Sequence, residues 1–214
     1  MLIISLIFII LSILQFISIL IDIFKRPQKM FIMNIVWPLT GLYFPILGII
    51  GYYTLGRTKI DRQTNHNKPF WQSVIISTTH CSAGCSLGNL IGAPVIFLFG
   101  ITFFSNELAT TLIIEFILAY IFGLLFQYFH MEIKHDHPLA DLKDAVKADT
   151  FSLIAFEIGM FGFMIVMRFA INNALLQPNK LEYWFLMQIA MLIGFITSYP
   201  VNWYLVKKGI KHAM

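Results

Sequence analysis

Six long apolar segments dominate this chain and determine the class of fold open to it. Each has about 20 residues or more, enough to cross the hydrocarbon core of a bilayer as a helix, the element that satisfies its own backbone hydrogen bonds in lipid. Of the 214 residues, 58% are hydrophobic and 12% are charged. We therefore predict an all-α, polytopic transmembrane bundle of about six helices. The predicted spans are Leu2–Phe24, Met30–Leu55, Val74–Phe104, Leu108–Met131, Phe151–Ile171 and Tyr183–Val206.

The second segment leaves two paths open. It is interrupted by Pro38, Gly41, Pro45 and Gly48, and such residues break helices or accompany re-entrant ones. A broken or re-entrant helix would return to the side from which it came and would place the two termini on opposite sides. Six complete crossings are the simpler interpretation, but the residues alone do not decide between the two.

Basic residues predict which side of the membrane is cytoplasmic, because Lys and Arg near helix ends resist export. They cluster in Arg57–Lys68, in Lys134–Lys147 and in the tail from Lys207 onwards. With six crossings these regions share the cytoplasmic side with both termini. The basic residues of Lys25–Lys29 are then an exception to the rule.

The chain is divided into an N-terminal transmembrane helix with its basic loop, residues 1–29, and a core transmembrane domain, residues 30–214. The net charge of +4 suits contact with anionic lipid headgroups, so the lipid bilayer is the predicted partner and nucleic acid is excluded. A protein partner stays undetermined. Phosphate-binding glycine loops, nucleophile elbows, zinc-protease helices and dinucleotide fingerprints are absent from the sequence.

The segment Thr79–Gly88 carries both cysteines of the chain beside His80. An imidazole inside a membrane helix is costly and usually faces a partner or a water-filled cavity. Cys81 and Cys85 are one helical turn apart, with Cβ atoms about 5–6 Å from each other, whereas a disulfide prefers about 3.5–4.5 Å. Thiolate and imidazole ligands suit soft or borderline ions such as Cu(I) and Zn(II). The segment therefore predicts a metal site, although close helix packing through its small residues explains the pattern as well.

Two acidic residues inside later spans extend this candidate site. Glu115 lies near the middle of the fourth segment and Glu157 near the start of the fifth, and a carboxyl group in hydrocarbon marks either an ion pathway or a buried hydrogen bond. In the second case Gln188, Ser198 or Tyr199 of the last span is the expected partner. The candidate metal ligands are His80, Cys81, Cys85, Glu115 and Glu157.

Three further features receive structural roles first. Methionines on the last two spans offer thioether ligands, but flexible core filling is favoured. A His-rich and acidic stretch after the fourth span is as well explained by a solvated loop. Asp149 or Thr150 is expected to cap the fifth span. The methionines and the stretch comprise Met160, Met164, Met167, Met187, Met191, His130, Glu132, His135, Asp136 and His137.

Several motifs in order resemble the bacterial membrane proteins grouped as domain of unknown function 4396, and the resemblance runs from Asp22 to Met214. It implies a multi-pass protein of the bacterial inner membrane, with its hallmark inside Thr79–Gly88, and it supplies no activity. Some relatives are associated with copper-handling proteins. The motifs are Asn34–Thr40, Thr79–Gly88, Phe122–Tyr128, Lys147–Thr150, Met187–Met191, Gly194–Asn202 and Gly209–Lys211.

We expect the bundle to bind a soft transition-metal ion, with Cu(I) favoured over Zn(II), for transport or delivery across the membrane rather than for catalysis. Two alternatives come from other classes of function. The two thiols suit a redox relay that exchanges with a partner. The small polar face of the third span equally suits a membrane scaffold or assembly subunit.

Overall fold

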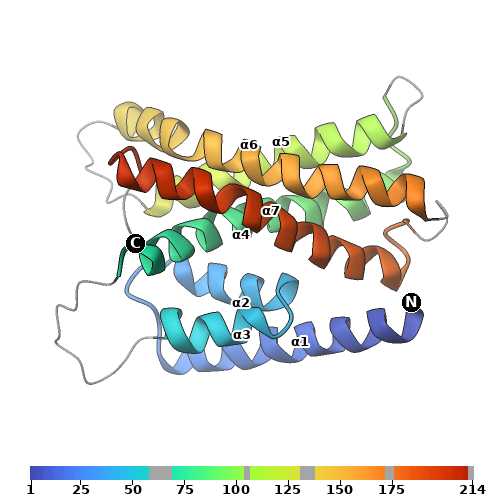
Figure 1. The fold of residues 1–214 in the computed structure, drawn as a ribbon, viewed down its shortest axis with the longest axis horizontal. Helices are drawn as coiled ribbons and strands as arrows, with labels where there is room; N and C mark the ends of the chain where they lie inside the picture. Colours follow the sequence, from blue (N-terminus) through green and yellow to red (C-terminus); the bar gives the residue numbers. More distant parts are fainter. Residues whose placement is uncertain (58–68, 104–106, 131–137, 172–175, 212–214) are drawn as a thin grey trace.

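A computed structural model of the chain describes residues 1–57, 69–103, 107–130, 138–171 and 176–211, and the regular elements within these ranges are all helical. The predicted all-α bundle is therefore confirmed (Figure 1). Its elements are α1 (Leu2–Lys25), α2 (Met33–Tyr43), α3 (Leu47–Gly51), a π-helical turn (Tyr52–Gly56), α4 (Phe70–Phe99), α5 (Glu107–His130), α6 (Pro138–Ala170) and α7 (Leu181–Lys207).

In the part of the chain that the structure describes, five helices are long and apolar enough to cross a membrane: α1, α4, α5, α6 from Asp149 onwards, and α7. They run alongside one another, and the N- and C-termini lie at opposite ends of the bundle (Figure 1). The sixth expected span, Met30–Leu55, is not a single helix. It is a broken pair, α2 and α3, that follows α1.

The α2–α3 pair is a short hairpin. Its two limbs touch, since a Cβ atom added to Gly48 would lie 2.6 Å from the carbonyl oxygen of Thr40. The chain returns to the end of α1 from which it came. There Arg57 donates two hydrogen bonds of 3.0 Å to the carboxylate of Asp22, and the hydroxyl of Tyr52 donates another of 2.8 Å. The base of the hairpin is therefore fixed beside the C-terminal end of α1.

The tip of the hairpin lies against the middle of α1, where Gln15 satisfies its open backbone groups. The Gln15 amide nitrogen donates to the carbonyl oxygens of Gly41 and Phe44, and its amide oxygen accepts from the N–H of Ile46 at 2.9 Å. Ile46 itself has a positive φ of 68°, which a tight reversal requires. Of the two paths that the sequence left open for this segment, the broken helix is the arrangement found.

Close backbone contact holds α4 against α5. A Cβ atom added to Gly84 would lie 2.7 Å from the Cα atom of Gly123, and one added to Gly88 would overlap the backbone of Ala119. Small residues allow this approach between membrane helices, where dispersion forces replace the hydrophobic effect. Helices α6 and α7 meet in the same way, because a Cβ atom on Gly194 would lie 2.8 Å from the carbonyl oxygen of Phe156. As a result α4 is the most deeply buried of the five long helices.

The α4–α5 contact predicts the effect of a single methyl group. Gly88→Ala inserts that group into the backbone of α5, so we expect it to lower the free energy of unfolding by about 1–3 kcal/mol, as overpacking does. Gly162→Ala in α6 is the matched control, because nothing lies within 4 Å of its added Cβ. Thermal unfolding of the two variants in detergent measures the difference. Equal unfolding temperatures for the two variants would contradict the close contact.

Candidate functional site: a buried polar core

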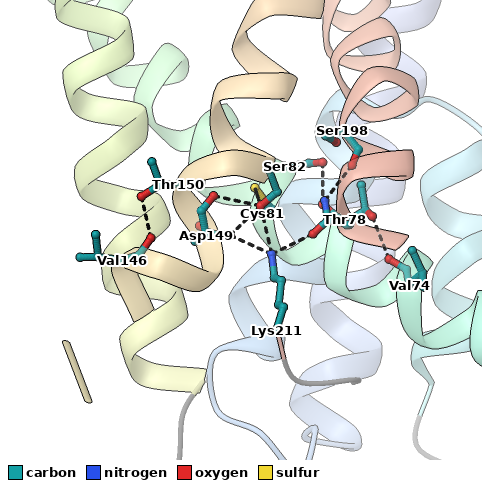
Figure 2. Close-up of polar contacts among 11 residues, drawn as sticks. Val74, Thr78, Cys81, Ser82, Val146, Asp149, Thr150, Ser198 and Lys211 are labelled. Carbon is teal, nitrogen blue, oxygen red and sulfur yellow. Dashed lines mark hydrogen bonds and ion pairs between the residues drawn. The ribbon is translucent and has the colours of Figure 1, made fainter. Parts of the chain in front are cut away.

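A buried ion pair lies between α4, α6 and α7. The ammonium nitrogen of Lys211 is 2.8 Å from Oδ1 of Asp149, 2.9 Å from Oδ1 of Asn202 and 3.3 Å from Oγ of Ser152. The side chains of Lys211 and Asp149 are both 0% exposed. Lys211 arrives from the turn after α7 and extends into the bundle toward α6 (Figure 2). Gly209, at a φ of 69°, lies in this turn.

The surroundings of Lys211 keep it charged. Burial by itself lowers the pKa of its ammonium group, but the negative charge of Asp149, the neighbouring Cys81 and Cys85 and the hydrogen bond to Asp149 together outweigh burial, so the pKa is raised above its ordinary value. Its three N–H donors match the three oxygen acceptors around it. Asp149 keeps one carboxylate oxygen, Oδ2, that is buried and has no hydrogen-bond partner among the described residues.

This ion pair is not predicted by the sequence pattern. Asp149 was expected to cap the fifth span, but α6 begins at Pro138, so Asp149 lies well inside the helix and its side chain faces the core. Lys211 was grouped with the basic tail. Three of the motifs that carry the family resemblance each contribute one residue to this cluster, and they are the sequence feature that points to it. These motifs are Lys147–Thr150, Gly194–Asn202 and Gly209–Lys211.

The two cysteines lie directly beside this cluster. Both are free thiols that are 0% exposed, and Sγ of Cys81 is 3.6 Å from Oγ of Ser152. Cys85 interacts with the side chain of Cys81 and with the carboxyl group of Glu157. Glu157 is 2% exposed, and both of its carboxyl oxygens are buried without a hydrogen-bond partner among the described residues. Cys81, Cys85 and Glu157 therefore form one group of neighbours.

The other two candidate ligands lie elsewhere. The ring of His80 packs edge-on against Phe126 of α5, with ring centroids 6.0 Å apart, because His80 shares the α5-facing side of α4 with Gly84. Glu115 of α5 accepts a hydrogen bond of 3.4 Å from the hydroxyl of Tyr183. Among the described residues, no three His, Cys, Asp and Glu side chains are grouped so that they could hold a metal ion. The predicted five-ligand set is not assembled in this structure.

Glu115 instead lines a cavity of about 290 Å³ at the end of the bundle where the N-terminus lies. Glu107 and Arg168 also line this cavity, and Glu115 is only 2% exposed. The carboxyl groups of Glu115 and Glu157 interact electrostatically. Glu115, Glu157, the two thiols and the ion pair of Lys211 are thus buried polar groups that lie between the Glu115 cavity and the other end of the bundle.

The hydrogen-bond partners that the sequence suggested for the carboxyl groups have other roles. Gln188 donates to the hydroxyl of Ser12 at 2.8 Å and to the carbonyl oxygen of Leu42 at 3.1 Å, so it fastens α7 to α1 and to the hairpin. Ser198 donates to the backbone of its own helix. The partner of Glu115 does come from the last span, but it is Tyr183.

Two buried methionines turn their sulfur atoms toward polar groups of α4. Sδ of Met160 accepts a hydrogen bond of 3.1 Å from Asn89, and Sδ of Met191 accepts one of 3.2 Å from Ser86. They pack in the core, as expected for flexible apolar side chains, and they also place thioethers in the interior of the bundle. Residues 131–137, which hold most of the His-rich and acidic stretch, lie outside the part of the chain that the structure describes. The side chain of His130 lies outside it as well.

The ion pair predicts a pattern of stability in three variants. Asp149→Asn and Lys211→Met each leave a buried group without its partner, so we expect each to lower the free energy of unfolding by about 3–5 kcal/mol. The double variant removes both charges and should recover part of that loss. Thermal unfolding in detergent with choline chloride as the only salt measures all three variants. Losses that simply add in the double variant would contradict direct pairing.

The comparisons with known proteins identify one family. The family model described as a domain of unknown function, DUF4396, matches residues 70–211, a range that includes α4 to α7 and Lys211. The match includes every member of the buried core and leaves out α1 and the hairpin. No curated protein and no solved structure matches the chain.

Proposed function

This chain belongs to the DUF4396 family, and we propose that it is a membrane transport protein for a soft metal ion, with Cu(I) the favoured cargo and Zn(II) the second choice. The observation that supports the proposal is the series of ionisable and sulfur groups described above. It links the Glu115 cavity at one end of the bundle with the Lys211 ion pair at the other. Polar groups are costly inside a membrane bundle, so several of them placed between its two ends favour a pathway over packing alone.

The chemistry of the central group favours a soft ion. Cys81 and Cys85 are adjacent thiols, and thiolate and thioether sulfur select Cu(I) over hard cations. Metal binding requires both thiols to lose their protons, and Glu157 lies beside Cys85. Cu(I) forms stable complexes with two sulfur ligands, so the thiol pair is a sufficient first site. His80 and Glu115 are then not ligands of this first site. They contact the ion before it reaches the thiols or after it leaves them.

The two ends of the series have different access. At one end the Glu115 cavity offers carboxylate oxygens to an arriving cation. At the other end Lys211 fills the space beside Ser152 and Cys81 and closes the series with a positive charge. This asymmetry is what a transporter needs, because a site that is open at both ends would leak its coupling ions.

The arrangement also supports an orientation. The hairpin replaces one crossing, so five crossings place the termini on opposite sides (Figure 1). Among the described basic residues, only Arg168 and Lys180 lie at the N-terminal end of the bundle, and the others lie at the C-terminal end. By the positive-inside rule the C-terminus is cytoplasmic and the N-terminus is outside. In place of the expectation of two cytoplasmic termini we therefore propose this orientation, in a bacterial inner membrane, with Lys25–Lys29 no longer an exception.

The alternatives have weaker support. A thiol relay needs a cysteine that a partner can reach, and both thiols are fully buried. A scaffold role accounts for the close packing of α4 and α5 but not for the charged and acidic groups in the core. Transport accounts for both.

The metal site predicts the outcome of elemental analysis. The purified protein, kept reduced and supplied with Cu(I) or Zn(II), should retain close to one metal ion per chain, and Cys81→Ser with Cys85→Ser should abolish this retention. Met30→Leu is the control, since Met30 is exposed and lies between α1 and α2, away from the thiols and the Glu115 cavity. Equal metal content in the native protein and the double serine variant would overturn the proposal.

The orientation predicts the labelling of two engineered cysteines. Lys29→Cys and Lys180→Cys both replace exposed residues, and the native thiols are buried and should stay unlabelled. In intact cells a membrane-impermeant maleimide should label Lys180→Cys, and it should label Lys29→Cys only after lysis. Labelling of Lys29→Cys in intact cells would mean that residues 30–55 cross the membrane completely.

A further inference from the structure

We propose that Asp149, Asn202 and Ser152 form a binding site for a small monovalent cation of the Na⁺ class, and that in this conformation the ammonium group of Lys211 occupies the place of the ion. The site lies next to the thiol pair but differs from it in chemistry. The contacts of its own oxygen atoms support it, and it does not depend on metal binding by the thiols.

The donor set fits a hard cation. A carboxylate oxygen, an amide oxygen and a hydroxyl oxygen converge on one point, at 2.8, 2.9 and 3.3 Å from the ammonium nitrogen. Oxygen ligands of this kind select hard ions, whereas sulfur selects soft ones. One carboxylate supplies one negative charge, which a monovalent ion balances as Lys211 does. The oxygen set is fully enclosed, since Asp149, Ser152 and Asn202 are all 0% exposed.

A second observation points to a ligand at this position. Oδ2 of Asp149 is buried and has no hydrogen-bond partner among the described residues. It is also 3.3 Å from the position of a Cβ atom added to Gly123 of α5, so a side chain at that position would crowd it. An ion that replaces the ammonium group has no N–H directions to satisfy and is able to contact both oxygens of the carboxylate. A buried acceptor is costly to leave unpaired, and ion binding removes that cost.

Lys211 is attached in a way that allows exchange. It lies beyond the end of α7, and the N–H groups of Ile210 and Lys211 both bond to the carbonyl oxygen of Leu205. Withdrawal of Lys211 therefore requires a change in one terminal turn around Gly209 and leaves the five long helices in place. Lys211 and a free cation are thus competitors for one set of oxygens.

The exchange has a consequence for transport, and this step rests on the proposed function. Lys211 interacts electrostatically with Cys81 and Cys85 as well as with Asp149. When a cation displaces Lys211, the positive charge beside the thiols belongs to a bound ion in place of a side chain. That ion is able to dissociate into solution. Binding of the two ions is then coupled through Ser152, which contacts both sites.

The test compares Lys211→Met with the double variant Asp149→Asn/Lys211→Met. NaCl in place of choline chloride should raise the unfolding temperature of Lys211→Met, by roughly 5–11 °C when Na⁺ is at a hundredfold excess over its Kd. Lys208→Met replaces an exposed neighbour and is the control. NaCl should change the unfolding temperatures of the double variant and of Lys208→Met no more than it changes that of the native protein. No shift in Lys211→Met, or an equal shift in the double variant, would overturn the site.

A measurement on the native chain keeps the test decisive if Lys211→Met does not fold. Lys211 should resist an amine-reactive acetylating reagent in choline chloride and become several-fold more reactive in NaCl, while exposed Lys208 serves as the internal reference, both quantified by mass spectrometry. Unchanged reactivity of Lys211 across the Na⁺ range would contradict displacement. The Na⁺ response should persist when Cys81 and Cys85 are changed to serine, so failure of the thiol site and failure of this site are separable.

Discussion

The close approach of α4 and α5 decides where the functional side chains of α4 point. Glycines at positions 84 and 88 let the two backbones touch, and this contact fixes the rotation of α4 about its own axis. His80 is consequently held against Phe126 of α5, whereas Cys81, one residue later, faces Ser152 of α6. A rotation of one residue would exchange these surroundings. Packing therefore sets the surroundings of the candidate ligands in this helix: the small residues are the reason that the thiols face the interior.

The buried core combines sulfur and oxygen atoms, which suit different kinds of cation, within a few side chains. Sulfur atoms lie toward the middle of the bundle, and a set of oxygen atoms lies at its C-terminal end, with Ser152 in contact with both. Lys211 supplies the positive charge that makes a buried Asp149 tolerable, since a carboxylate without a partner would be expensive there. The charge balance of the whole core consequently depends on one side chain that is carried by a terminal turn, while the remaining groups are carried by rigid helices.

The sequence was sufficient for the class of fold and for most of its helices, because apolar length alone identifies a spanning helix. It was insufficient for the second segment, where the breaking residues indicated two possible paths and the outcome depends on Gln15, a contact between α1 and the hairpin that no local pattern contains. The five candidate ligands were correctly chosen as interior residues, since all five are buried. Their division between the thiol group, the α5 contact and the Glu115 cavity depends on helix rotation, which periodicity does not resolve. Lys211 was missed because a lysine beyond the last span has the pattern of a solvated tail.

The hairpin has a consequence for how the protein is made. Its tip exposes backbone groups that lipid is unable to satisfy, and the amide of Gln15 on α1 satisfies them. The hairpin is thus unfit to enter the membrane as an independent unit, and it requires α1 to be in place when it is released from the ribosome and the insertion machinery. Chain order meets this requirement, because α1 is synthesised first. Biogenesis of the N-terminal third is therefore sequential, with α1 acting as an internal template for the segment that follows it.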